Sequence, residues 1–156
     1  DASQHPRDGI AAEIRRQAAV WRSILGRPEP EVRARPRPDV WSALEYGCHV
    51  RDVFVLFLER LDLMLTEDAP QYANWDQDIT AAGSHYADQV PATVAYELAA
   101  AAGRLADRFA QVRGDAWQRT GHRSDGATFT VESFARYLLH DPVHHVWDVE
   151  RWREAS

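Results

Sequence analysis

Hydrophobic residues recur with the 3.6-residue spacing of amphipathic helices in four separate segments of this chain. The segments cover about residues 9–25, 42–65, 91–112 and 130–153. No stretch alternates between apolar and polar residues at the period of two that indicates a β-strand. The pattern therefore predicts an all-α protein.

Residues at the ends of these segments support the predicted helix bounds. Gly26 is placed to end the first helix. Ser42 and Glu45 have the spacing of a capping box at the start of the second helix. Pro91 suits the first turn of the third helix. Residues 27–38 hold four prolines, which favour an extended crossing over a continued helix.

The connections on either side of the third helix are longer than the usual loops of a helical bundle. Four helices joined in this way predict a four-helix bundle with long crossover connections. A chain of 156 residues can bury one good core and is too short for two ordinary domains. We therefore expect residues 1–156 to form a single domain.

Composition and net charge limit the kinds of molecule that the protein can be expected to bind. Hydrophobic residues make up 45% of the chain and charged residues 27%, as in soluble globular proteins. A net charge of −6 argues against a general affinity for nucleic acid. No apolar run approaches the roughly 20 residues that cross a bilayer, and no signal-peptide pattern opens the sequence. We therefore expect a cytoplasmic protein without a membrane segment that acts on a small molecule, and a homodimer is compatible with the pattern.

His49 lies in the apolar stripe of the second predicted helix, beside Val53 and Leu56. A buried imidazole needs a polar partner, and two interpretations are open. It is either a core histidine bonded to a neighbour such as Glu45 or Asp52, or a metal ligand.

The stretch HDPVHH in the last helix offers further candidates. His140 and His144 are four residues apart, which lets two imidazoles of one helix share a metal, although the same spacing also occurs on solvated faces. Asp148 lies one turn further and is a candidate ligand, orienting carboxylate, general base or surface residue. His145 is displaced by about 100° from His144, so we expect it to pack or to face a substrate. Pro142 predicts a distortion between the two histidines.

Three other residues are candidates for binding the substrate. Arg136 and Arg151 flank the histidine pair and could receive a carboxylate, or they could be solvated arginines. Trp75 lies in the long connection before the third helix, where it could line a pocket or pack over a helix end.

Two stretches together resemble the DinB-like superfamily of four-helix bundles, which includes mycothiol-dependent maleylpyruvate isomerases and bacillithiol transferases. They are PDVWSALEYGCHVRDV and, about ninety residues later, YLLHDPVHHVWDV. The resemblance covers about residues 39–149. It implies an up-down-down-up order of helices and a divalent metal held by His49, His140 and His144.

The resemblance also implies an activity. We expect zinc, while nickel, iron and manganese would fit the same donors. The leading hypothesis is a metal-dependent thiol S-transferase or thiol-assisted isomerase, which uses a low-molecular-weight thiol such as mycothiol on a small electrophile. One alternative is a metal-assisted hydrolase or lyase with Asp148 as base. The other is a non-catalytic bundle that binds a small ligand or a partner.

Overall fold

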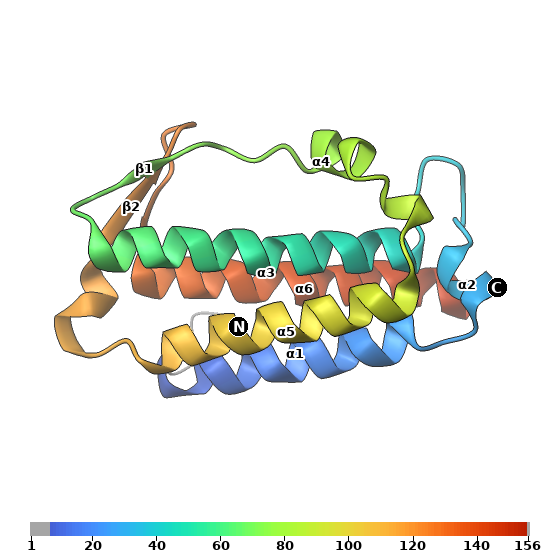
Figure 1. Cartoon of the computed structure of the whole chain (residues 1–156), viewed down its shortest axis with the longest axis horizontal. Coiled ribbons are helices and arrows are strands. Elements are labelled where there is room, and N and C mark those ends of the chain that lie inside the picture. The colour runs from blue at the N-terminus through green and yellow to red at the C-terminus, as the bar shows by residue number, and fades with distance from the viewer. Residues whose placement is uncertain (1–6, 156) are drawn as a thin grey trace.

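Four long helices form a bundle in the computed structural model, which describes residues 7–155 and leaves the first six residues and Ser156 outside the described part. The bundle helices are α1 (Ile10–Leu25), α3 (Ala43–Thr66), α5 (Pro91–Ala110) and α6 (Val131–Ala155). Figure 1 shows α1 and α6 running toward one end of the bundle and α3 and α5 toward the other. This confirms the predicted up-down-down-up bundle.

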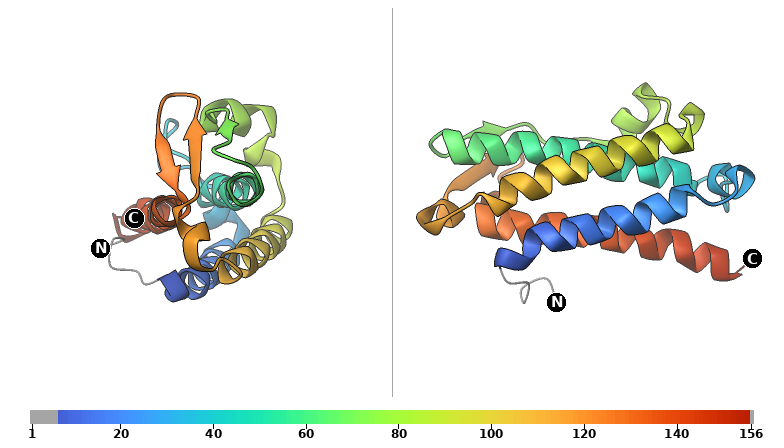
Figure 2. Two further views of the ribbon diagram at one scale, coloured as in Figure 1. Left: turned by 90° about the vertical axis from the view of Figure 1, so that its left-hand side faces the viewer. Right: turned by 60° about the horizontal axis from the view of Figure 1, so that its bottom comes forward.

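The order of neighbours around the bundle sets which faces meet. Helix α1 packs on α5, α5 on α3, α3 on α6, and α6 on α1. The end-on view in Figure 2 shows this ring of four. Helices α3 and α6 are therefore adjacent, although 64 residues separate the end of one from the start of the other. Side chains on their facing sides can meet.

Capping interactions fix where the two helices that carry the candidate site begin. The Ser42 hydroxyl accepts the Glu45 amide at 3.1 Å, and the Glu45 carboxylate accepts the Ser42 amide at 3.0 Å. The predicted capping box is thus confirmed. At the start of α6, the Thr130 hydroxyl accepts the Ser133 amide at 3.0 Å, and the Ser133 hydroxyl accepts the Thr130 amide at 2.9 Å.

The proline-rich segment differs from the extended crossing that the sequence predicts, because it contains a short helix, α2 (Glu29–Arg33). Pro28 is the residue before this helix and Pro30 lies within its first turn. Prolines at these positions remove no helical hydrogen bond, so a single turn can form. The fully buried side chain of Val32 anchors it to the rest of the protein.

A three-stranded sheet was not predicted. It consists of β1 (Gln71–Tyr72), β2 (Thr120–Arg123) and β3 (Thr128–Thr130). Strand β1 pairs with β2 in parallel, and β2 pairs with β3 in antiparallel register, with Gly121 opposite Phe129. Strands of two to four residues are too short to show an alternating pattern.

The connection between α3 and α5 runs back along the bundle over α3, as Figure 1 shows. It contains β1, the helix α4 (Gln77–Gly83) and the 3₁₀ turn η3 (Tyr86–Asp88). Helix α4 has no buried residue. Tyr86, by contrast, is fully buried and ties the end of the connection to α3, where its hydroxyl donates to Asp52.

The core is formed by apolar side chains from all four bundle helices, among them the fully buried Trp21, Phe54, Leu98 and Phe134. Gly47 permits a close approach between α3 and α1, because a Cβ atom there would lie 2.8 Å from a methyl carbon of Leu25. Within residues 7–155, none of the helices is long and apolar enough to span a membrane.

Candidate metal centre

His49 is held in the interior by aromatic side chains. It lies on α3 with only 1% of its surface exposed. The Trp75 ring stacks on it at 5.4 Å between centroids and 4° between planes, and the Trp41 ring lies 5.7 Å away. Trp75 thus packs against His49. Glu45 and Asp52, the two carboxylates considered as partners of His49, instead bind Arg35 and Tyr86.

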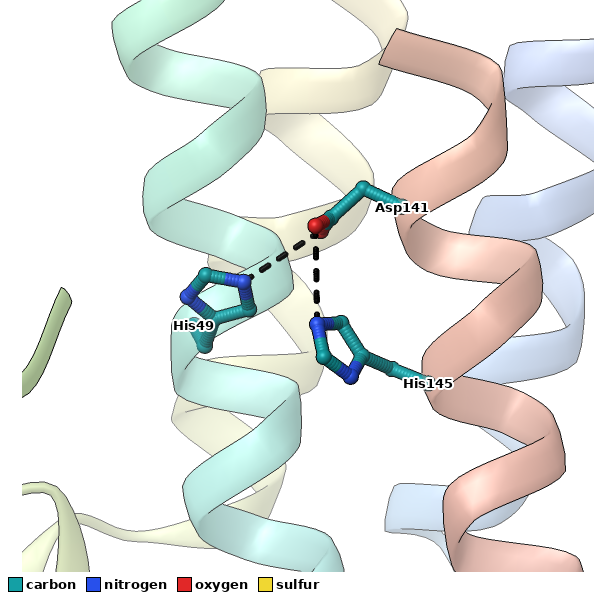
Figure 3. A group of neighbouring side chains, drawn as sticks. All are labelled: His49, Asp141 and His145. Carbon is teal, nitrogen blue, oxygen red and sulfur yellow. Dashed lines mark ion pairs between the residues drawn. The ribbon is translucent and has the colours of Figure 1, made fainter. Parts of the chain in front are cut away.

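Asp141 and His145, both on α6, point toward His49 (Figure 3). The His49 Nε2 atom lies 3.2 Å from Asp141 Oδ2, and His145 Nε2 lies 3.5 Å from Asp141 Oδ1. One potential ligand atom from each residue lies within 4.8 Å of the others. Asp141 and His145 are four residues apart, so they project from one face of α6.

The polar atoms in this cluster lack the hydrogen bonds that buried groups normally make. His49 Nδ1, His49 Nε2 and Asp141 Oδ2 are inaccessible to solvent and have no hydrogen-bond partner. His49 Nε2 and Asp141 Oδ2 face each other at short range, yet they are not aligned as donor and acceptor. Unpaired buried polar atoms are rare and costly. A cation bound between them would satisfy both, so these residues fit a divalent metal.

The charges of the cluster also suit a cation. Burial would raise the pKa of Asp141, but its interactions with His145 and then His49 outweigh burial and hold that pKa well below the usual range. Asp141 is therefore a carboxylate at neutral pH. Burial would likewise lower the pKa of His145, but its interactions with Asp141 and Asp148 raise it. A metal must displace the proton from this ring, so acidic pH should weaken binding.

Asp148 orients His145 from the side away from Asp141. Asp148 is buried, with 8% of its surface exposed, and its Oδ2 atom lies 3.0 Å from His145 Nδ1. When Asp148 accepts a hydrogen bond from Nδ1, the Nε2 lone pair of a neutral His145 is left facing Asp141. Of the roles considered from the sequence, the contacts of Asp148 match the orienting carboxylate.

His140 and His144, the two ligands expected on α6, do not join His49 in the structure. Both residues are exposed. Their rings lie parallel at 6.3 Å, and the His144 ring lies 6.0 Å from that of the exposed Trp147. The ligand set that the structure brings together is instead His49, Asp141 and His145, so the expectation that His145 stands apart from the ligands is also revised.

The physical reason is the rotation of α6. Leu138 and Pro142 are buried against the bundle, which turns Asp141 and His145 toward α3 and the neighbouring row of His140 and His144 outward. HDPVHH contains two pairs of residues with a spacing of four, His140 with His144 and Asp141 with His145. The second pair is shifted from the first by one residue. Helix α6 is continuous through Pro142, where a distortion was predicted, and the Pro142 carbonyl accepts a hydrogen bond from Trp21.

The two arginines expected to bind a substrate are engaged by neighbouring side chains of α6. Arg136 donates to Glu132 at 2.5 Å. The Arg151 guanidinium lies over the rings of Trp147 and Trp152, at 4.8 and 5.3 Å, and within 4.0 Å of Asp148.

The sequence did not lead us to predict Asp141 as a site residue, although its spacing from His145 was the available signal. It also missed Tyr46, whose ring lies 5.0 Å from that of His145, because aromatic residues on an inward face predict only packing.

Taken together, the fold and this cluster define a helical bundle with a candidate metal site between two adjacent helices. The sequence profile of the DinB superfamily matches residues 12–149, and the chain belongs to that superfamily. Among solved structures, it is similar to YfiT from Bacillus subtilis, with a TM-score of 0.81 and 16% sequence identity. The match covers 95% of this chain and 87% of the YfiT chain. YfiT is described as a probable metal-dependent hydrolase with an unusual four-helix bundle topology. Among curated proteins, no sequence matches significantly.

Proposed function

We propose that this protein is a metal-dependent enzyme that hydrolyses a small molecule, with one divalent metal held by His49, Asp141 and His145. The observation that carries the proposal is the convergence of two imidazoles and one carboxylate whose facing atoms lack hydrogen bonds. Two histidines and one carboxylate form the ligand set of several hydrolytic zinc sites, in which a further position stays open. A bound metal would supply Lewis acidity, which lowers the pKa of a coordinated nucleophile.

The protein's own residues have separate tasks in this proposal. Asp148 fixes the orientation of His145 through the 3.0 Å hydrogen bond. Trp75 and Trp41 cover His49 and keep water from its ring. Asp148 is engaged with His145, so we assign it as a positioning residue in place of the general base considered from the sequence. Zinc remains the expected metal, although iron, manganese and nickel also bind nitrogen and oxygen donors.

Two comparisons support this proposal. Membership of the DinB superfamily fits a metal-binding bundle, and the structurally similar YfiT is described as a probable metal-dependent hydrolase. The convergence of His49 on α3 with Asp141 and His145 on α6 adds an argument that is specific to this chain.

Hydrolysis of chromogenic esters and amides, without any thiol, tests the proposal. We expect turnover that a chelator abolishes and added zinc restores. Asp141→Ala should remove this turnover because it deletes a metal ligand, whereas His140→Ala should retain it because His140 is exposed. Turnover that survives both the chelator and Asp141→Ala would overturn the proposal.

Thiol transfer is the second candidate, and it rests on the resemblance of the two histidine-containing stretches to a superfamily that includes thiol-dependent isomerases and transferases. In this reaction a low-molecular-weight thiol such as mycothiol would bind at the same centre and attack a small electrophile as thiolate. The two candidates separate when monobromobimane is offered with and without the thiol. Metal-dependent conjugation together with an absence of hydrolysis would favour thiol transfer.

A further inference from the structure

A cavity of about 450 Å³ lies at the end of the bundle where α6 ends. Its walls include parts of the segment 27–36, Trp41 just before α3, Ala43 at the start of α3, and parts of the stretch 148–153 in α6. Pockets for small organic molecules have volumes of roughly 300–1,000 Å³. The cavity is therefore large enough for such a molecule.

The cavity shares two side chains with the candidate metal centre. Trp41 lines the cavity, and its ring lies 5.7 Å from that of His49. Asp148 also lines the cavity, and it accepts the hydrogen bond from His145. A molecule in the cavity would therefore contact the residue that orients one metal ligand and the residue that covers another.

The arginines of the lining are already neutralised. Arg35 binds both carboxylate oxygens of Glu45, at 2.8 and 2.5 Å. Arg27 is paired with Glu150 at 2.5 Å and Arg153 with Glu31 at 2.9 Å. These pairs join the proline-rich segment to α3 and α6 around the cavity. They leave little unpaired positive charge on the lining for an anionic ligand.

The remainder of the lining is apolar. Its members are two indole rings and five smaller side chains: Trp41, Trp152, Val32, Ala34, Pro36, Ala43 and Val149. Apolar walls with few polar groups favour ligands that bury hydrocarbon surface.

We propose that this cavity binds a predominantly apolar, uncharged organic molecule beside the metal centre. That the bound molecule is the substrate rests on the proposed function, whereas the binding itself does not. The chemistry of the walls selects an uncharged aromatic or alicyclic compound over a phosphorylated or sulfonated one.

N-phenyl-1-naphthylamine is a suitable neutral probe, and 1-anilinonaphthalene-8-sulfonate is its charged counterpart with the same ring system. We expect the neutral probe to bind with one-to-one stoichiometry in fluorescence titrations and the sulfonate to bind about tenfold more weakly or worse, because Arg27, Arg35 and Arg153 of the lining are already paired with carboxylates. Equal or tighter binding of the sulfonate would overturn the selectivity.

Cavity-filling variants locate the probe. Ala43→Phe and Val149→Phe should each weaken binding of the neutral probe about tenfold or more, because a phenyl ring would occupy the volume it needs. Ala116→Phe, at a half-buried alanine that does not line the cavity, is the matched control and should leave binding unchanged. Circular dichroism selects the folded variants, and unchanged binding in a folded cavity variant would refute the location.

Manganese tests whether the cavity lies beside the metal centre. In protein loaded with Mn²⁺, the proton NMR lines of the bound neutral probe should broaden. His49→Ala should remove the broadening and keep the binding, because His49 lines no part of the cavity. Sharp lines in manganese-loaded wild type would contradict the placement. Failure of the wild type to take up metal would refute the proposed function, while the titrations would still decide on the cavity.

Discussion

Replacing Asp148 should weaken metal binding in two graded steps, although Asp148 is not itself a proposed ligand. The carboxylate is buried and accepts a hydrogen bond from His145 Nδ1 at 3.0 Å, on the opposite side of the ring from the proposed metal-binding nitrogen. It therefore fixes the tautomer of the ring and raises the basicity of the ligand nitrogen. Asp148→Asn keeps the size and an acceptor oxygen but removes the charge. Asp148→Ala removes both.

Loss of such an orienting partner typically costs 10–100-fold in metal affinity, or about 1.4–2.8 kcal/mol. Because asparagine can still accept the hydrogen bond, we expect Asp148→Asn to lie near the lower figure. Asp148→Ala should approach the upper figure, because it also leaves His145 free to rotate.

Competition with a fluorescent zinc chelator measures these affinities. Asp62→Asn is the matched control, because it removes one negative charge from α3 at an exposed ion pair with Arg108. It should change zinc affinity by less than about twofold, as expected for a screened surface charge. If both Asp148 variants bind zinc as tightly as the wild type, or if Asp62→Asn weakens binding equally, the assigned role of Asp148 is wrong.

Three further predictions concern stability. Burial would raise the pKa of Glu45, but Arg35 and the Ser42 amide hold it below its usual 4.5, so the ionised carboxylate stabilises the protein above that pH and less as the pH falls. Glu45→Gln should therefore lower the free energy of unfolding by about 1–2 kcal/mol at pH 7 in urea titrations. The difference from the wild type should narrow below pH 4.5. A difference that grows toward acid would contradict this. Phe134→Ala should lower the free energy of unfolding by about 3–5 kcal/mol, because the ring is buried and lies 4.5 Å from that of Phe57. A decrease below about 1 kcal/mol would refute the core assignment. Zinc at about 100 times its Kd should stabilise the wild type by about 2.7 kcal/mol and His145→Ala far less, as thermal unfolding would show; equal stabilisation would exclude His145 as a ligand.

The long helices could be predicted because a bundle helix needs an apolar face at a period of 3.6 residues. Local signals also marked where they begin, as the capping box of Ser42 and Glu45 shows. The small sheet could not be predicted in this way. Its strands are two to four residues long, and β1 pairs with a strand about fifty residues away. Such pairing depends on where the bundle places the two connections.

The candidate site shows the limit of spacing as a guide. His49 was predicted as an inward residue, and it is buried. On α6, however, residues four apart form two neighbouring rows, and only the rotation of the helix decides which row faces α3. His140 and His144 were expected as ligands from the family resemblance and their four-residue spacing, and Asp141 was not considered. The exposure of His140 and His144 follows from the burial of Leu138 and Pro142, a tertiary feature that local spacing does not fix.

The most direct test of the account is the metal content of purified protein, measured by inductively coupled plasma mass spectrometry after preparation without chelators. We predict about one equivalent of a divalent metal in the wild type and in the double variant His140→Ala, His144→Ala. The metal should be lost from His49→Ala, Asp141→Ala and His145→Ala. Loss of metal from the double variant together with its retention in Asp141→Ala would contradict the account and would identify His140 and His144 as the ligands on α6.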